Sequence, residues 1–136
     1  MLGIGSHRNV LSDFIDSCVQ DFLTTHINSI GDLEVLLALV DGGARWWDVP
    51  SMAAQLGIPV TAARRALDAL AASNLLAIRV SDDIRYQLQP GNADLEERVQ
   101  QFVAAYRKSP VSVLRWVDRR SRAGNDVSPL FQFKNS

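Results

Sequence analysis

The side chains that most often carry out catalysis are few and far apart in this chain of 136 residues. The two histidines, His7 and His26, are nineteen residues apart, and the sole cysteine, Cys18, has no base beside it that would activate its thiol. The sequence has neither the close Cys and His spacing of a zinc site nor a phosphate-binding glycine loop. We therefore predict that the protein is not an enzyme and needs no metal and no cofactor.

Arginine and lysine offer a different chemistry, the binding of phosphates and other anions. The formal net charge is -1, but residues 1–50 carry two basic and seven acidic side chains, whereas residues 91–136 carry eight basic and five acidic ones. Nucleic-acid-binding domains draw much of their affinity from basic residues, so the second half of the chain is better suited to that role. The densest basic cluster lies beside an apolar segment, Leu130–Phe133. It indicates either contact with DNA or protein, or an ordinary charged terminus, and consists of Arg115, Arg119, Arg120, Arg122 and Lys134.

Hydrophobic periodicity predicts the first helices. Pairs of apolar residues four positions apart indicate an amphipathic helix over residues 10–23, in which we expect Cys18 to be a buried structural thiol. A second and more apolar helix is predicted from the N-cap Ser29 to the Gly42-Gly43 stop. Arg45-Trp46-Trp47 is then too short for a helix and is predicted to be a brief extended segment.

Two further helices and a hairpin are predicted next. The helices cover residues 50–56 and 59–73, with Gly57 in the tight turn between them. Alternating apolar residues then indicate two strands, over residues 76–80 and 84–88, joined by Ser81-Asp82-Asp83.

We predict a single domain that is mainly α-helical with a small β-hairpin. After the hairpin, Asp94 and Glu97 are expected to cap one helix, and a last helix is expected from Val111 to about Arg120. No aliphatic run is long enough to cross a bilayer and no secretion signal is recognisable, so we expect a cytoplasmic protein without membrane contact. The predicted parts are an N-terminal helix (9–28), a core (29–90), C-terminal helices (91–122) and a tail (123–136).

The order of these elements resembles the winged helix-turn-helix domains of MarR-like bacterial transcription regulators. From Ser51 the run SMAAQLGIPVTAARRALDALAASNLL is similar to the helix-turn-helix core of that family, with residues 53–58 as first helix and turn. Gly57 permits the positive φ of the turn, and we expect Ala54 to let the two helices approach closely. The resemblance covers about residues 30–88 and implies that the helix after the turn binds double-stranded DNA.

Helix geometry and this resemblance together give the candidate contact residues. With the apolar side of the helix over residues 59–73 facing the core, Thr61 and Arg65 point outward, flanked by Arg64 and Asp68. The resemblance implies that Thr61, Arg64 and Arg65 contact bases or phosphates in the major groove. Asp68 is predicted to orient one of the arginines from one turn away. The alternative is that both arginines simply lie on a solvated helix face.

The hairpin offers two more candidates. Arg79 and Arg85 lie on its strands and either contact the DNA backbone or are solvated strand residues. Asp82 and Asp83 lie at its tip and repel phosphates, so we do not expect the tip to enter a minor groove.

The partners expected from this interpretation are double-stranded DNA and a second copy of the chain. In MarR-like regulators the helices before and after the winged core form a homodimer, although these helices could instead complete the core of a monomer. A winged helix can also bind protein rather than DNA, and the near-neutral charge and acidic hairpin tip favour that alternative. Three tryptophans either line a small-ligand pocket or close the core, namely Trp46, Trp47 and Trp116.

Overall fold

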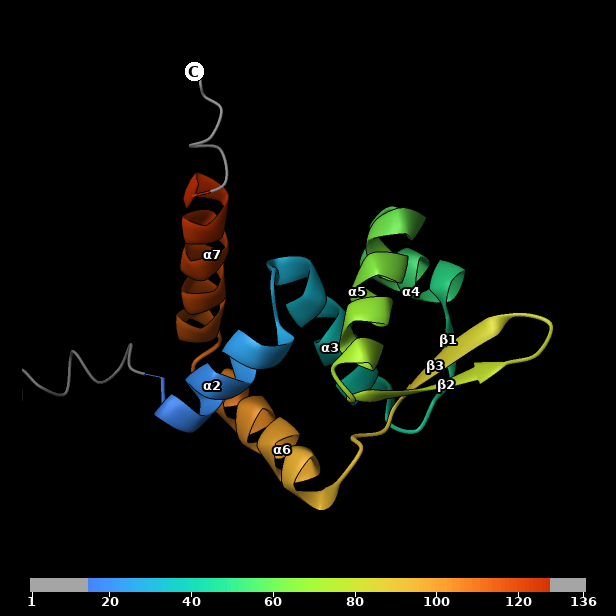
Figure 1. Ribbon diagram of the computed structural model, residues 1–136, viewed down its shortest axis with the longest axis horizontal. Coiled ribbons are helices and arrows are strands. Elements are labelled where there is room, and N and C mark those ends of the chain that lie inside the picture. The colour runs from blue at the N-terminus through green and yellow to red at the C-terminus, as the bar shows by residue number, and fades with distance from the viewer. Residues whose placement is uncertain (1–14, 128–136) are drawn as a thin grey trace, which may run out of the picture.

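A computed structural model describes residues 15–127 of the chain, with side chains up to residue 121 (Figure 1). Within that range it contains six helices and three short strands, so the predicted mainly α-helical fold with a small β-hairpin is confirmed. In chain order the elements are α2 (Ser17–His26), α3 (Ile30–Gly42), β1 (Trp47–Asp48), α4 (Val49–Leu56), α5 (Val60–Ala72), β2 (Leu76–Val80), β3 (Ile84–Leu88), α6 (Ala93–Lys108) and α7 (Pro110–Val127).

The part from α3 to β3 is a winged helix-turn-helix. α3 packs on α4 and α5, Gly57 makes the turn between α4 and α5, and β2 and β3 form a hairpin, the wing, that projects from the core (Figure 1). β1 pairs with β3, so the sheet has the order β1-β3-β2 and is antiparallel throughout. The predicted extended segment at residues 45–47 thus becomes a third strand at Trp47–Asp48, because Trp47 pairs with Tyr86.

Side chains that accept hydrogen bonds from backbone amides mark where α3 and α4 begin. The hydroxyl of Ser29 accepts from the Asp32 amide at 3.3 Å, and the carboxylate of Asp48 accepts from the Ser51 amide at 2.7 Å. Each bond satisfies one of the amides that the first turn of a helix leaves without a partner. The start of α3 at Ser29 is therefore as predicted.

The start of α6 differs from the prediction. Asn92, not the pair Asp94 and Glu97, is the N-cap, and its side-chain oxygen accepts from the Leu95 amide at 2.8 Å. Asn92 has extended backbone dihedrals, so it is the last residue outside the helix, whereas Asp94 already lies in the first turn. There the Asp94 carboxylate accepts from Nε of Arg98 at 3.0 Å.

α2 begins at Ser17, so Ile15 and Asp16, which the predicted N-terminal helix includes, precede it. The carboxylate of Asp16 accepts from the Cys18 amide at 3.1 Å and caps α2. Residues 10–14, which were included in the predicted helix, lie outside the described residues. The prediction of a buried Cys18 is wrong: the thiol is exposed, because Cys18 lies in the first turn at the edge of the face that Val19 and Phe22 bury.

The last helix is longer than predicted, since α7 continues from Pro110 to Val127. A glycine in a helix interior costs only about 1 kcal/mol relative to alanine, so Gly124 does not by itself end the helix. The apolar segment Leu130–Phe133 and Lys134 lie outside the described residues.

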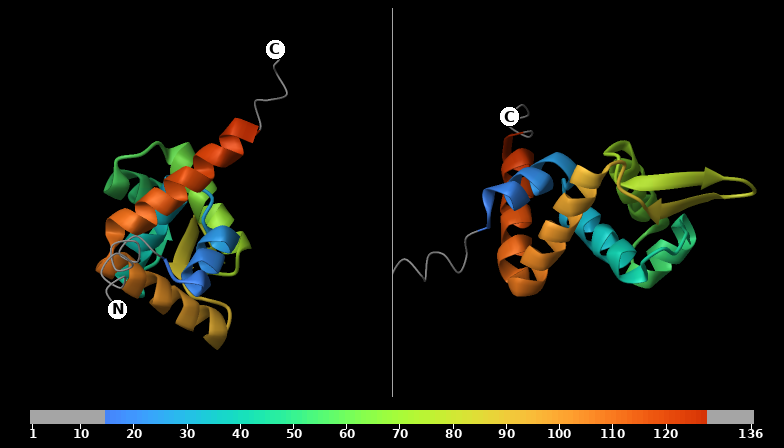
Figure 2. Two further views of the ribbon diagram at one scale, coloured as in Figure 1. Left: turned by 90° about the vertical axis from the view of Figure 1, so that its left-hand side faces the viewer. Right: turned by 90° about the horizontal axis from the view of Figure 1, so that it is seen from below.

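α2, α6 and α7 form a body beside the winged core. The ring of Phe22 on α2 stacks on that of Phe102 on α6, with 5.4 Å between the ring centroids. α7 packs on α6 and α3 and buries Val113 and Val117. The wing and α7 lie at opposite ends of the molecule (Figure 2).

α3 is the central helix and contacts α4, α5, α7 and β3. Leu33, Leu36 and Leu39 on this helix are completely buried, which explains its strongly apolar sequence. No single helix in residues 15–127 is both long and apolar enough to cross a membrane; α2 and α3 pass that test only as a pair, and the pair is bent by 105°.

Candidate nucleic-acid interface

One face of α5 carries the main predicted contact residues. Thr61, Arg64 and Arg65 are all exposed and lie within the first half of the helix, as the helix geometry predicts. The other face packs against the core and consists of Ala63, Ala66, Leu67 and Leu70. The structure thus brings these three predicted residues together on one surface.

The turn between α4 and α5 determines how this surface is presented. Gly57 has φ 65° and ψ 38°, a left-handed conformation that residues with a side chain rarely adopt. The small residue that faces the core on α4 is Ala53, whereas Ala54, for which we predict close helix packing, is exposed. One residue corresponds to about 100° of helix rotation, so this shift moves the side chain to another face.

The backbone amides in the first turn of α5 are available to an external acceptor. α5 follows Pro59, and no side chain caps it. Side chains do cap α2, α3, α4 and α6. Free amides at a helix N-terminus carry partial positive charge and favour an anion such as a phosphate.

The two arginines on α5 form no ion pair with other residues in the part of the chain that the structure describes. Arg64 lines a cavity of about 310 Å³ between α4, α5 and the wing, where Asp83 and Ile84 also lie. Arg65 lies close enough to α3 to affect Asp32. Burial raises the pKa of that carboxyl above its ordinary value, and a backbone hydrogen bond and the charge of Arg65 partly oppose the rise.

Asp68 connects α5 to the wing. Its carboxylate accepts a hydrogen bond from the Tyr86 hydroxyl on β3 at 2.5 Å, so its predicted role of orienting an arginine is replaced by this contact. Burial, the hydrogen bond to Asp68 and its negative charge raise the pKa of Tyr86 to about 12. The bond fixes the wing relative to the face that carries Arg64.

The wing arginines lie on a different face. Arg79 and Arg85 are cross-strand partners, and their side chains share the face opposite to the one that Tyr86 directs towards α5. The guanidinium of Arg79 lies over the Trp46 ring, 4.5 Å from its centroid. Nε of Arg85 forms an ion pair with Asp83 at 3.1 Å. The structure therefore does not bring Arg79 and Arg85 together with the three residues on α5.

The face of the wing that begins at Tyr86 is apolar up to its tip. Ile78, Val80 and Ile84 lie on it and are 50%, 72% and 40% exposed. The alternation of these residues in the sequence predicts strands. It does not predict that the side chains are exposed, which results from α5 covering only the base of the wing.

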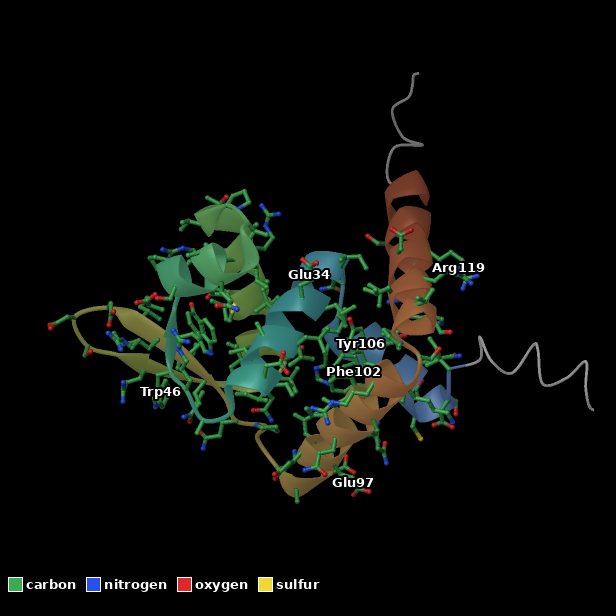
Figure 3. All side chains as sticks on the ribbon, turned by 180° about the vertical axis from the view of Figure 1, so that it is seen from behind. Glu34, Trp46, Glu97, Phe102, Tyr106 and Arg119 are labelled. Atoms are coloured by element: carbon green, nitrogen blue, oxygen red, sulfur yellow. The ribbon has the colours of Figure 1, made fainter. Side chains whose placement is uncertain are left out.

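Arg115, Arg119 and Arg120 of the predicted basic cluster lie on α7, away from α5, whereas the side chain of Arg122 and the whole of Lys134 lie outside the described residues. Figure 3 shows Arg119 on this helix, on the side of the molecule opposite to the wing base, where Trp46 lies. Arg120 donates to the carbonyl oxygen of Thr24 at 3.5 Å and lies 5.7 Å from the centroid of Trp116. The cluster is thus a surface of the body rather than an extension of the α5 surface.

No protein-family model and no curated protein matches the chain. Among the described residues, no group of three or more His, Cys, Asp or Glu side chains is arranged to hold a metal ion. The indications of function therefore come from the exposed side chains of the winged helix-turn-helix.

Proposed function

We propose that the protein is a transcription regulator of the MarR-like kind that binds double-stranded DNA, with α5 as the recognition helix in the major groove. The observation that carries this proposal is the cluster of Thr61, Arg64 and Arg65 on the exposed face of the second helix of a helix-turn-helix. Because neither arginine is engaged in an ion pair within the described residues, both guanidinium groups are available to an external acceptor.

The chemistry of these side chains suits the groove. An arginine can donate two hydrogen bonds to O6 and N7 of guanine or can pair with a phosphate, and a threonine can contact a base or a backbone oxygen. The uncapped first turn of α5 offers further amides to a phosphate. The neighbouring side chains Ala62 and Ala72 are small, which allows the helix to lie deep in the groove.

A homodimer would place two copies of α5 on one duplex. We propose such a dimer, formed through the N-terminal and C-terminal helices, which binds two half-sites about one DNA turn apart. Arg79 and Arg85 could contact the DNA backbone beside each half-site, whereas Asp82 at the wing tip would repel it.

The test compares two double variants that remove the same charge. Duplexes selected by the wild-type protein from a random-sequence pool should bind Arg64→Ala/Arg65→Ala at least about 30-fold more weakly, because two contacts of about 1 kcal/mol or more are lost. The control Arg107→Ala/Lys108→Ala on α6 should keep nearly full affinity. The melting temperatures of both should stay within about 3 °C of wild type, since all four side chains are exposed.

Unchanged affinity of the α5 variant, or an equal loss in the control, would place the DNA surface elsewhere. The basic cluster on α7 would then be the next surface to test.

A second candidate function is the binding of a protein by the wing. The observation that favours it is the exposed apolar face formed by Ile78, Val80 and Ile84, which is unusual for a surface that faces a polyanion. This function predicts that no duplex is retained even at low salt. It also predicts a protein partner whose binding is lost in Ile78→Ser/Val80→Ser and retained in Arg64→Ala/Arg65→Ala.

A further inference from the structure

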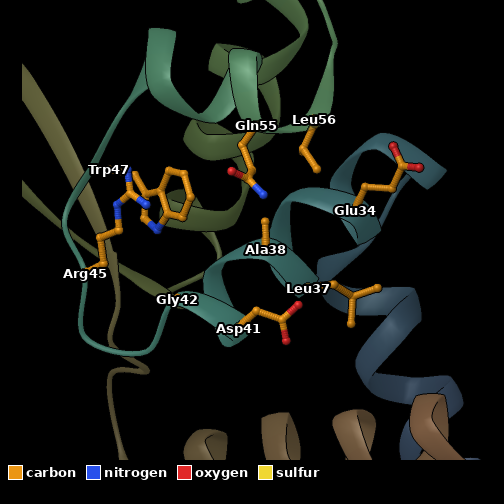
Figure 4. A pocket seen from close by; sticks show the side chains of 9 residues that line it. All are labelled: Glu34, Leu37, Ala38, Asp41, Gly42, Arg45, Trp47, Gln55 and Leu56. Atoms are coloured by element: carbon orange, nitrogen blue, oxygen red, sulfur yellow. The ribbon is translucent and has the colours of Figure 1, made fainter.

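A hollow of about 410 Å³ on the winged core is lined by residues that the α5 surface does not use (Figure 4). It lies between α3, the segment that leads into β1, and the end of α4. Leu37, Ala38 and Leu56 give it an apolar middle. Polar and charged side chains surround this middle, namely Glu34, Asp41, Arg45 and Gln55.

The acidic side of the hollow consists of two carboxylates on α3. Glu34 and Asp41 are seven residues apart, which places them on the same face of the helix and roughly 10 Å apart along its axis. Neither side chain forms an ion pair or a hydrogen bond with another described residue. Asp41 also lies in the last turn of α3, where the helix dipole is negative and a cation is favoured.

Trp47 supplies an independent observation, a hydrogen-bond donor beside the hollow that has no acceptor among the described residues. Its side chain is 3% exposed, and Nε1 is buried with no hydrogen-bond partner among the described residues. A Cβ atom added to Gly42 would lie 3.2 Å from Nε1, so the indole N–H faces Gly42, which itself lines the hollow. Buried donors nearly always have an acceptor, and here none comes from the described part of the chain.

Arg45 supplies a positive charge beside that donor. Its guanidinium carbon lies 3.8 Å from the centroid of the Trp47 ring, and the side chain forms no ion pair in the described part of the chain. Figure 4 shows Arg45 across the indole, while Asp41 and Glu34 follow along α3. The hollow thus presents donors for an anionic group at one end and carboxylates for cationic groups along its side.

We propose that this hollow binds a free amino acid with a cationic side chain, such as lysine. Its carboxylate accepts from Trp47 Nε1 and pairs with Arg45, and its α-ammonium group pairs with Asp41. The aliphatic chain lies over the apolar middle of the hollow, and the terminal cation reaches Glu34. Two cationic groups joined by a short aliphatic chain match two carboxylates separated by two helix turns.

Isothermal titration of the full chain with L-lysine, without DNA, tests this proposal and is independent of the proposed DNA binding. L-lysine should bind at least tenfold more tightly than L-norleucine, which lacks the side-chain ammonium group, and than cadaverine, which lacks the carboxylate. Asp41→Asn and Arg45→Gln should each weaken lysine binding at least tenfold. Asp21→Asn on α2 is the matched control and should leave it unchanged. The side chains of Asp21, Asp41 and Arg45 are exposed, so these substitutions do not disturb the core. A substitution of the buried Trp47 would disturb it.

Three results would overturn the proposal. One is the absence of any heat of binding, and of any rise in melting temperature, at millimolar lysine. Another is cadaverine binding as tightly as lysine, which would leave the Trp47 and Arg45 end without a role. The third is lysine affinity that is unchanged in Asp41→Asn or Arg45→Gln.

Discussion

His26 is a buried histidine whose Nδ1 has no hydrogen-bond partner among the described residues. Its ring contacts Phe22, with 4.8 Å between centroids, and α2 packs here on α6. Burial lowers the pKa of His26 below its ordinary value of 6.5, and the positive charge of Arg98 on α6 lowers it further. The folded protein therefore keeps this side chain neutral at a pH where the unfolded chain is already protonated.

The free energy of unfolding should consequently depend on pH below neutrality. The stabilising effect of a neutral His26 is complete above pH 6.5, and is lost as the pH falls from there through the lowered pKa. In urea titrations between pH 7.5 and 5, His26→Leu should flatten this decline and should change stability at pH 7.5 by less than about 1 kcal/mol, since an unpartnered polar group is replaced by an apolar one. His7→Gln is the control. An equal pH dependence in wild type and His26→Leu would contradict the prediction.

Single residues were predictable where the signal is local. Ser29 precedes an apolar run and caps α3 as expected, and Thr61, Arg64 and Arg65 are exposed because the apolar spacing of α5 defines its buried side. Asp68 was not predictable, because its partner Tyr86 is eighteen residues away and on another element. The orphaned N–H of Trp47 likewise depends on how three separate segments meet.

At the level of elements, the contact between Tyr86 and Asp68 fixes the wing to α5. Tyr86→Phe removes a hydrogen bond to a carboxylate and should lower the free energy of unfolding by about 1 to 2 kcal/mol, because Asp68 remains partly solvated. If the wing contributes to DNA binding, the affinity for a selected duplex should also fall. Tyr106→Phe, on α6, is the matched control and should change stability less. Stability that is unchanged in Tyr86→Phe would show that the bond is not made in solution.

The same contact has a second measurable effect at high pH. The pKa of Tyr86 is raised from 10.0 to about 12, so the neutral phenol stabilises the folded state fully below pH 10, and this contribution is lost as the pH rises through 12. Tyr86→Phe should therefore lose less stability than wild type between pH 10 and 12, as followed by circular dichroism during urea titration. A larger loss in the variant would be inconsistent with this assignment.

The elements themselves followed closely from periodicity and caps, in particular α3, α4, α5 and the hairpin. The structure differs from the predicted elements where a contact between distant residues, or a weak sequence signal, determines the secondary structure. β1 becomes a strand only through its pairing with β3, and α7 continues through Gly124, whose cost is small. The apolar wing face was not predictable because alternation reports which residues share a face but not how far α5 covers it.

On the scale of the whole molecule, α7 bears on the proposed dimer. Val111 is 59% exposed, and the partly buried Leu114, three residues further on, lies beside it on the same side of the helix. Such a pair of apolar side chains on a helix at the end of the molecule, away from α5, suits contact with a second copy that leaves both copies of α5 exposed.

The dimer can be tested with a single charge at this surface. Val111→Glu lies in the first turn of α7, where an acidic residue is compatible with the helix dipole, so the monomer should remain folded. In a twofold interface the substitution introduces two unpaired carboxylates and should weaken the dimer at least about 100-fold. Light scattering after size exclusion should then show a dimer for wild type at 100 µM and a monomer for the variant. Val80→Glu on the wing is the control and should remain dimeric. A monomeric wild-type protein at that concentration would refute the dimer, and with it the expectation of two half-sites about one DNA turn apart.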